Sequence, residues 1–126
     1  MAGDPAIRWQ VMRDLHDTPE PEWQAERGQL LERGWATNLL ARQNAESGWG
    51  DGVYSPKWIS STYTLSGLRE MDLPGDCEQA QRGAKVMIGR MLGETSNATF
   101  LCRLANCDRC IVGMIMEISV YFWIKD

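Results

Sequence analysis

Histidine is nearly absent from this sequence of 126 residues, which contains only His16. Histidine is the commonest general base and a frequent zinc ligand, so little room is left for chemistry based on imidazole. A basic stripe is also missing, and 17 acidic residues against 13 basic ones give a net charge of −4. The sequence therefore argues against binding to nucleic acid or to an anionic membrane surface.

Long apolar runs are missing as well. The most apolar stretch, residues 111–124, is interrupted by Glu117 and Ser119, whereas a membrane-spanning helix needs about 20 apolar residues. The first residues lack a basic segment followed by an apolar one, so no secretory signal is expected. We predict a cytoplasmic protein without a membrane span, whose four cysteines are reduced.

Tryptophan, in contrast, is abundant: five of the six tryptophans fall within residues 1–58. A hydrophobic share of 44% is enough for a core, and the length is typical of one domain, so residues 1–126 are predicted to fold as a single unit. No segment alternates between apolar and polar residues over the length of a strand. The predicted class is therefore all-α.

Start signals and apolar spacing place the helices. Asp4 before Pro5 predicts a capped first helix, and Thr18 before Pro19 repeats that signal. The predicted helices run from Pro5 to about His16, from Pro19 to about Gln43, from about Trp58 to Met71, from Asp76 to about Met91 and from Asp108 to Ile124. The apolar face of the first is predicted to hold Ile7, Val11, Met12 and Leu15. Residues 44–57 and 93–106 are predicted to be loops.

One segment is more specific than the rest. In residues 33–50, Trp35 begins a helical turn, aliphatic residues follow, and Gln43 precedes the Gly48-Trp49 pair. This pattern resembles the Gln-Trp (QW) repeat of the squalene cyclase and prenyltransferase superfamily, the terpenoid cyclase-like proteins. Residues 54–65 and 108–122 are similar to other segments of these proteins. The resemblance implies antiparallel helical hairpins that form part of an α/α toroid.

A closed toroid of this family needs more hairpins than the sequence provides, so we expect a partial or truncated member. An open array of hairpins leaves apolar surface exposed. That surface predicts a partner, which is either an apolar small molecule or another protein chain, including a second copy in a homo-oligomer.

Gln43 and Trp49 are predicted to be structural residues. A glutamine amide can satisfy unpaired N–H and C=O groups at helix ends, and a tryptophan ring stacked on it shields those bonds from water. The two residues would then tie neighbouring helices together.

The chemistry of the superfamily is only partly matched. The acidic Asp-x-Asp-Asp cluster of the squalene cyclases and the aspartate-rich Mg²⁺ motif of terpene synthases do not occur in the sequence. Aromatic side chains remain, and they can line a cavity and stabilise a carbocation. The candidate ligand-binding residues are Trp9, Trp35, Tyr54, Trp58 and Tyr63. The favoured interpretation is that these rings pack a small helical core.

Zinc is the alternative cofactor, although we expect none. Asp108-Arg109-Cys110 resembles the Asp-x-Cys pair of protein prenyltransferases, but the downstream histidine of that family is missing. Independently, Cys102, Cys107 and Cys110 have a spacing that suits thiolate ligation of zinc. A fourth ligand would be Cys77, His16 or Asp108. The favoured interpretation is that Cys107 and Cys110 are small buried residues at a helix start.

Catalytic residues cannot be assigned, and the candidates are Asp108, Cys110 and Glu117. A cysteine nucleophile would need His16 nearby for activation. Glu117 lies among apolar residues, where a buried carboxyl group has a raised pKa and can donate a proton. We favour instead a position on the solvent side of its helix.

Three functions therefore stay open. The first, implied by the resemblance, is a squalene-cyclase/prenyltransferase-like protein that binds an isoprenoid or another apolar ligand without complete catalytic machinery. The second is a helical protein-interaction module that oligomerises. The third is a small zinc-binding domain built on Cys102, Cys107 and Cys110.

Overall fold

The computed structural model describes residues 2–92 and 108–123, and every regular element in these ranges is helical. The elements are α1 (Pro5–Asp14), α2 (Glu20–Gly28), the short 3-10 helix η1 (Gln29–Leu31), α3 (Trp35–Leu40), α4 (Ser61–Glu70), α5 (Glu78–Leu92) and α7 (Arg109–Trp123). The predicted all-α class is confirmed. None of the described helices is both long and apolar enough to cross a membrane.

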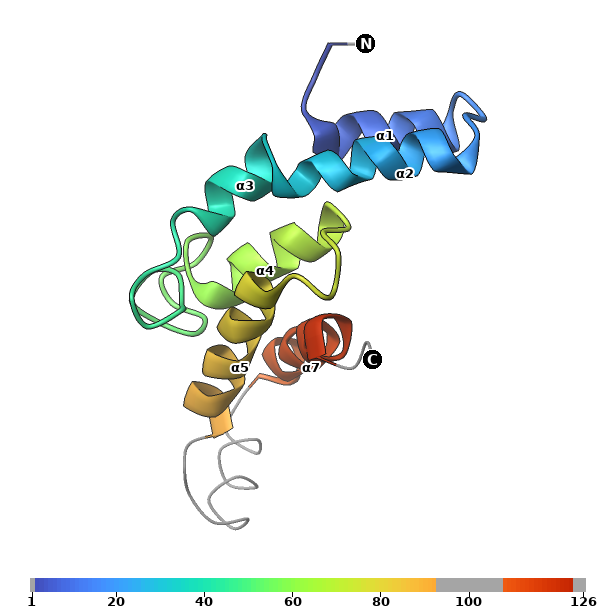
Figure 1. The fold of residues 1–126 in the computed structure, drawn as a ribbon. Coiled ribbons are helices and arrows are strands. Elements are labelled where there is room, and N and C mark those ends of the chain that lie inside the picture. Colours follow the sequence, from blue (N-terminus) through green and yellow to red (C-terminus); the bar gives the residue numbers. More distant parts are fainter. Residues whose placement is uncertain (1, 93–107, 124–126) are drawn as a thin grey trace.

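Helices α1 and α2 form an antiparallel hairpin at one end of the molecule (Figure 1). As predicted, α1 begins after Asp4, whose Oδ1 accepts a hydrogen bond from the N–H of Ala6 at 2.9 Å. The predicted apolar face is wrong, because Ile7 and Leu15 are 50% and 76% exposed. The buried face holds Ala6 and Trp9. Trp9 sets this orientation, since its ring packs on Trp23 of α2 with 6.0 Å between the centroids.

The helix predicted from Pro19 to Gln43 is broken into α2, η1 and α3. The break lies at Gly34, which has a φ of 93° that side chains rarely adopt. A Cβ at this position would lie 2.5 Å from Oδ2 of Asp4. That same oxygen accepts a hydrogen bond from the N–H of Trp35 at 2.8 Å, so Asp4 contacts the starts of both α1 and α3. The predicted cap at Thr18 is also wrong, because α2 begins after Pro19, which makes no side-chain hydrogen bond.

Helix α4 begins at Ser61, three residues later than predicted. Trp58 has a φ of 72°, outside the helical region. The predicted loop over 44–57 is confirmed and extends to Ser60. Two hydroxyl groups fix its end: Ser60 Oγ donates to the carbonyl of Tyr54 at 2.8 Å, and Thr62 Oγ1 donates to that of Val53 at 2.7 Å.

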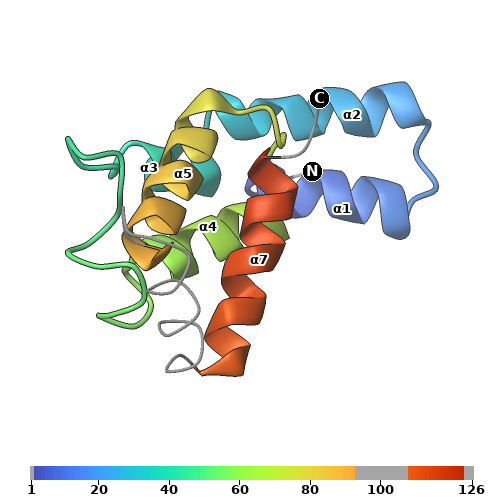
Figure 2. The ribbon, with the colours of Figure 1, turned by 90° about the horizontal axis from the view of Figure 1, so that it is seen from below.

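Helix α4 packs against both α5 and α7 (Figure 2). Helix α5 begins at Glu78 and α7 directly after Asp108, close to the predicted starts. The carbonyl of Asp108 accepts hydrogen bonds from the N–H groups of Ile111 and Val112. The loop predicted over 93–106 lies outside the described residues.

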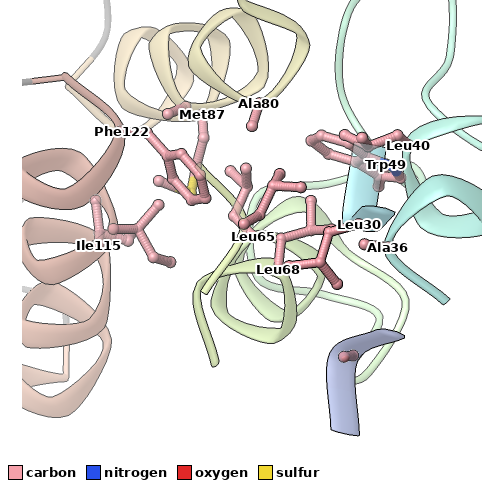
Figure 3. Packing of buried hydrophobic residues seen from close by; sticks show 14 of the residues in the cluster. Leu30, Ala36, Leu40, Trp49, Leu65, Leu68, Ala80, Met87, Ile115 and Phe122 are labelled. Carbon is pink, nitrogen blue, oxygen red and sulfur yellow. The ribbon is translucent and has the colours of Figure 1, made fainter. Parts of the chain in front are cut away.

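The core is one apolar cluster with α4 in its middle (Figure 3). Leu65 and Leu68 of α4 lie between the side chains of α5 and α7 on one side and those of η1, α3 and the following loop on the other. All of these side chains are at most 6% exposed: Leu30, Ala36, Leu40, Trp49, Leu65, Leu68, Met87, Ile115 and Phe122. The predicted toroid arrangement of these helices stays a prediction.

Candidate functional site

Gln43 and Gln79 join the end of α3 to the start of α5. Gln43 Nε2 donates to the carbonyls of Ser47 at 2.9 Å and Gln79 at 3.0 Å. Gln79 Nε2 donates in return to the carbonyl of Leu40, the last residue of α3, at 2.7 Å. Each amide therefore satisfies a backbone carbonyl of the other segment. The bonds of Gln43 are those of a residue that ties two segments together, and its partner Gln79 had no distinguishing signal in the sequence.

Trp49, in the loop after α3, packs against this junction. Its ring is 3% exposed, and Nε1 donates to the carbonyl of Leu39 at 2.7 Å. On α5 the ring meets Gly83, where a Cβ would lie 2.4 Å from Cζ3 of Trp49. The backbone N–H of Trp49 donates to Ser61 Oγ at the start of α4. Trp49 thus connects three helices.

Two of the five candidate ligand-binding aromatics, Trp9 and Trp35, make no ring contact with the other three. Trp9 is a core residue of the α1–α2 hairpin, and its Nε1 donates to the carbonyl of Met71 at 3.2 Å. The guanidinium of Arg13 lies 4.5 Å from the centroid of this ring, a cation–π distance. Trp35 begins α3 and is 53% exposed.

The other three aromatics come together in an aromatic cluster of Tyr54, Trp58 and Tyr63. The ring of Tyr63 lies 5.2 Å from that of Tyr54 and 5.0 Å from that of Trp58, centroid to centroid. Both distances are typical of aromatic rings that pack on one another. The outer ring, Trp58, is 78% exposed.

Tyr63 donates a hydrogen bond to the hydroxyl of Tyr54 at 2.8 Å. This bond is the largest cause, and burial the second, of a rise in the pKa of Tyr63 to about 12. The bond requires the phenol proton, so it stabilises the neutral form of Tyr63. The Cys110 thiol contributes a smaller effect in the same direction.

The zinc candidates are only partly described. Cys102 and Cys107 lie outside the described residues. Cys110 is exposed rather than buried as expected, Cys77 is half-buried before α5, and His16 is exposed after α1. Within residues 2–92 and 108–123, no three His, Cys, Asp or Glu side chains are grouped to hold a metal ion. A zinc site on Cys102, Cys107, Cys110 and Asp108 stays a prediction.

Glu117 is on the solvent side of α7, as favoured from the sequence. Its side chain is 55% exposed and pairs with Arg69 of α4 at 2.7 Å. The same guanidinium pairs with Glu70 at 2.7 Å. Glu117 is therefore in contact with water and with a guanidinium rather than enclosed by apolar side chains.

Beside this ion pair the surface is hollowed over a volume of about 350 Å³. The hollow is lined by Arg69, Met116, Glu117, Val120 and Tyr121. Tyr121 is fixed in place, because two acceptors share its single hydroxyl proton: Asp72 Oδ1 at 2.6 Å and the carbonyl of Leu73 at 2.8 Å. Burial, helped by the bond to Asp72, raises the pKa of Tyr121 above its usual value.

The hollow continues onto the exposed side of α7, which we call the outer face. Met116 and Val120 are 62% and 57% exposed, whereas Ile115, Ile118 and Phe122 on the opposite side belong to the core. The outer face consists of Arg109, Gly113, Met116, Glu117 and Val120, all exposed and three or four positions apart. Sequence reasoning missed this face, because apolar residues cover both sides of α7.

A second hollow, of about 330 Å³, lies between the loop and α5. Its walls include Asn44, Glu46, Asp51 and Arg90. Asn44 Oδ1 accepts the N–H groups of Glu46 and Gly48, which is a local turn, and Arg90 pairs with Glu46. Asn44, Glu46 and Arg90 are thus bonded to groups of the hollow's own surroundings. None of the candidate ligand-binding aromatics lines either hollow.

Comparison with known proteins finds no match: no family model, no curated protein and no solved structure is similar to this chain. The resemblance to the squalene cyclase and prenyltransferase superfamily therefore stays a prediction. The most distinctive feature of the described residues is the outer face of α7.

Proposed function

We propose that this chain is a helical protein-interaction module that binds an amphipathic helix of a protein partner on the outer face of α7. The observation that carries this proposal is the exposure of Met116 and Val120, one helical turn apart, beside a hollow of about 350 Å³. Burial of a side chain of this size contributes about 1.5–3 kcal/mol, so leaving two of them in water is costly without a partner.

The shape and the charges favour a helix as that partner. Apolar residues three and four positions apart are the pattern with which helices pack on one another. The hollow can accept one apolar side chain of the partner. Arg69, Arg109 and Glu117 surround the apolar residues, which resembles the polar rim that sets orientation in helix-in-groove complexes.

A second candidate is an isoprenoid or another apolar small molecule in the same hollow, as the sequence resemblance implies. The volume of the hollow falls within the range of about 300–1,000 Å³ that is usual for ligand pockets. Farnesol is a suitable probe, because a bound ligand raises the melting temperature in proportion to the logarithm of its concentration. A rise that increases with the farnesol concentration and disappears in Val120→Ser favours the small molecule.

The helix proposal is tested with a labelled peptide that has a leucine stripe flanked by lysines. We expect saturable binding in fluorescence anisotropy, lost in the double variant Met116→Ser/Val120→Ser. The matched control is Ile7→Ser, since Ile7 is also about half exposed, at 50%, but lies on α1. Binding that is equal in the double variant and in wild type overturns the proposal, as does the absence of saturable binding.

A further inference from the structure

We infer that the helix bound by the outer face of α7 is the α7 of a second copy of this chain, antiparallel to the first and crossing it at Gly113. This inference rests on the proposed function, because it names the partner of that same surface. Three features of α7 support it: the spacing of its charges, the glycine between them and the apolar residues beside them.

The charges are placed symmetrically about Gly113. Arg109 comes four residues before it and Glu117 four residues after it. With a rise of 1.5 Å per residue, each lies about 6 Å from Gly113 along the helix. A two-fold axis at Gly113 therefore brings Arg109 of each copy level with Glu117 of the other, and symmetry forms this pair twice.

Both partners of this pair can take part. Glu117 uses Oε1 for Arg69, and its side chain is still 55% exposed. Arg109 is exposed and has no ion-pair partner among the residues that the structure describes. A parallel arrangement would bring Arg109 next to Arg109 and Glu117 next to Glu117, and like charges oppose association. Charge complementarity thus selects the antiparallel arrangement.

Gly113 suits the crossing point. It is exposed, and a Cβ there would meet nothing within 4 Å, so the fold of one copy does not require glycine at this position. A glycine at a crossing lets two backbones approach closely. Met116 and Val120 then lie beside the crossing, and pairing covers these two residues of both copies. An unrelated helix would need matching charges by chance, whereas a second copy supplies them by symmetry.

The first experiment compares two glycines by sedimentation velocity of the full chain over a concentration series in reducing buffer. Gly113→Glu places two like charges at the two-fold axis, and we expect the dimer dissociation constant to rise at least roughly tenfold. The matched control is Gly89→Glu on α5, an exposed helical glycine that also has nothing within 4 Å of a Cβ. We expect this control to dimerise like wild type.

The second experiment exchanges the charges. Arg109→Glu alone should weaken the dimer, because it faces Glu117 of the other copy. The double variant Arg109→Glu/Glu117→Arg should recover most of the loss, since the pair is restored with its signs reversed. Circular dichroism checks that the double variant stays folded when Arg69 loses its partner. A folded double variant that dimerises no better than Arg109→Glu overturns the antiparallel pairing.

The outcomes separate this inference from the proposed function. A wild-type chain that is monomeric at every concentration overturns the inference. If the leucine-stripe peptide still binds this monomer and fails to bind Met116→Ser/Val120→Ser, the proposed function stands. A dimer that neither Gly113→Glu nor Met116→Ser/Val120→Ser weakens also overturns the inference, because association then uses another surface.

Discussion

The ring of Trp49 lies against the backbone of Gly83, so closely that a Cβ on Gly83 would be 2.4 Å from the ring. The contact joins the loop after α3 to the middle of α5. Trp49 is buried and hydrogen-bonded to Leu39, so its ring cannot move aside freely. The absence of one side chain thus determines how closely the loop approaches the helix.

Gly83→Ala is expected to lower the free energy of unfolding by about 1–3 kcal/mol, because the added methyl group overpacks the junction. Chemical denaturation measures this change. The control is Gly89→Ala, which adds a methyl group in open space on the same helix. It should raise stability by about 0.5–1 kcal/mol through helix propensity. An increase in both variants would contradict the close contact.

Gln43→Glu is expected to lower the free energy of unfolding by about 1–3 kcal/mol. The two carbonyls that accept from Gln43 Nε2, those of Ser47 and Gln79, would then face a carboxylate oxygen. Thermal unfolding followed by circular dichroism reports the loss. Gln24→Glu, at an exposed position of α2, makes the same chemical change without these partners. Equal melting temperatures for the two variants would rule out the structural role of Gln43.

Tyr63 is expected to give a pH dependence at high pH. Its pKa is raised from 10.0 to about 12 in the folded protein, so the folded state holds this proton more tightly than the unfolded state. The contribution to stability is complete below pH 10 and is lost as the pH rises through 12. Tyrosinate absorbance should show a component near pH 12 that Tyr63→Phe removes. If Tyr63→Phe instead removes a component near pH 10, the ordinary value, the hydrogen bond to Tyr54 is disproved.

Asp4 is expected to show a graded response, because each of its two oxygens accepts from a different helix start. Asp4→Ala removes both bonds and should cost about 1–2 kcal/mol, the usual effect of losing a cap. Asp4→Asn keeps one acceptor oxygen and should lie between wild type and Asp4→Ala. Urea denaturation gives the order. The same stability for Asp4→Asn and Asp4→Ala would show that a single accepted bond contributes nothing.

The parts of the fold that follow from neighbouring residues were predictable. Asp4 before Pro5, the glycines of residues 44–57 and Asp108 before an apolar run each act locally; both helices begin directly after their aspartate, and the loop contains the predicted residues. The break at Gly34 was not predictable, because its cause is the carboxylate of Asp4, distant in sequence. The same holds for the buried face of α1, which the contact between Trp9 and Trp23 decides.

The candidate site was also predictable only in part. The tie between helices through Gln43 and Trp49 was expected from the residue types, but their partners Gln79 and Gly83 were not, since only the fold brings α5 to them. For α7, hydrophobicity alone does not show which apolar residues are buried. The ion pair between Arg69 and Glu117 shows the orientation of the helix, and it requires α4 to lie alongside.

Asp72 connects helix α7 to the N-terminal hairpin. Its carboxylate accepts the hydroxyl of Tyr121 at 2.6 Å and pairs with Nε of Arg27 of α2 at 3.0 Å. Helix α7 and the N-terminal hairpin thus bond to the same carboxylate. A shift of either one that moves Asp72 changes the bond that the other makes. We therefore expect that a helix docked on α7, as proposed above, affects α2 through this shared carboxylate. Slower amide exchange in α2, far from the contact surface, is the signature of that coupling.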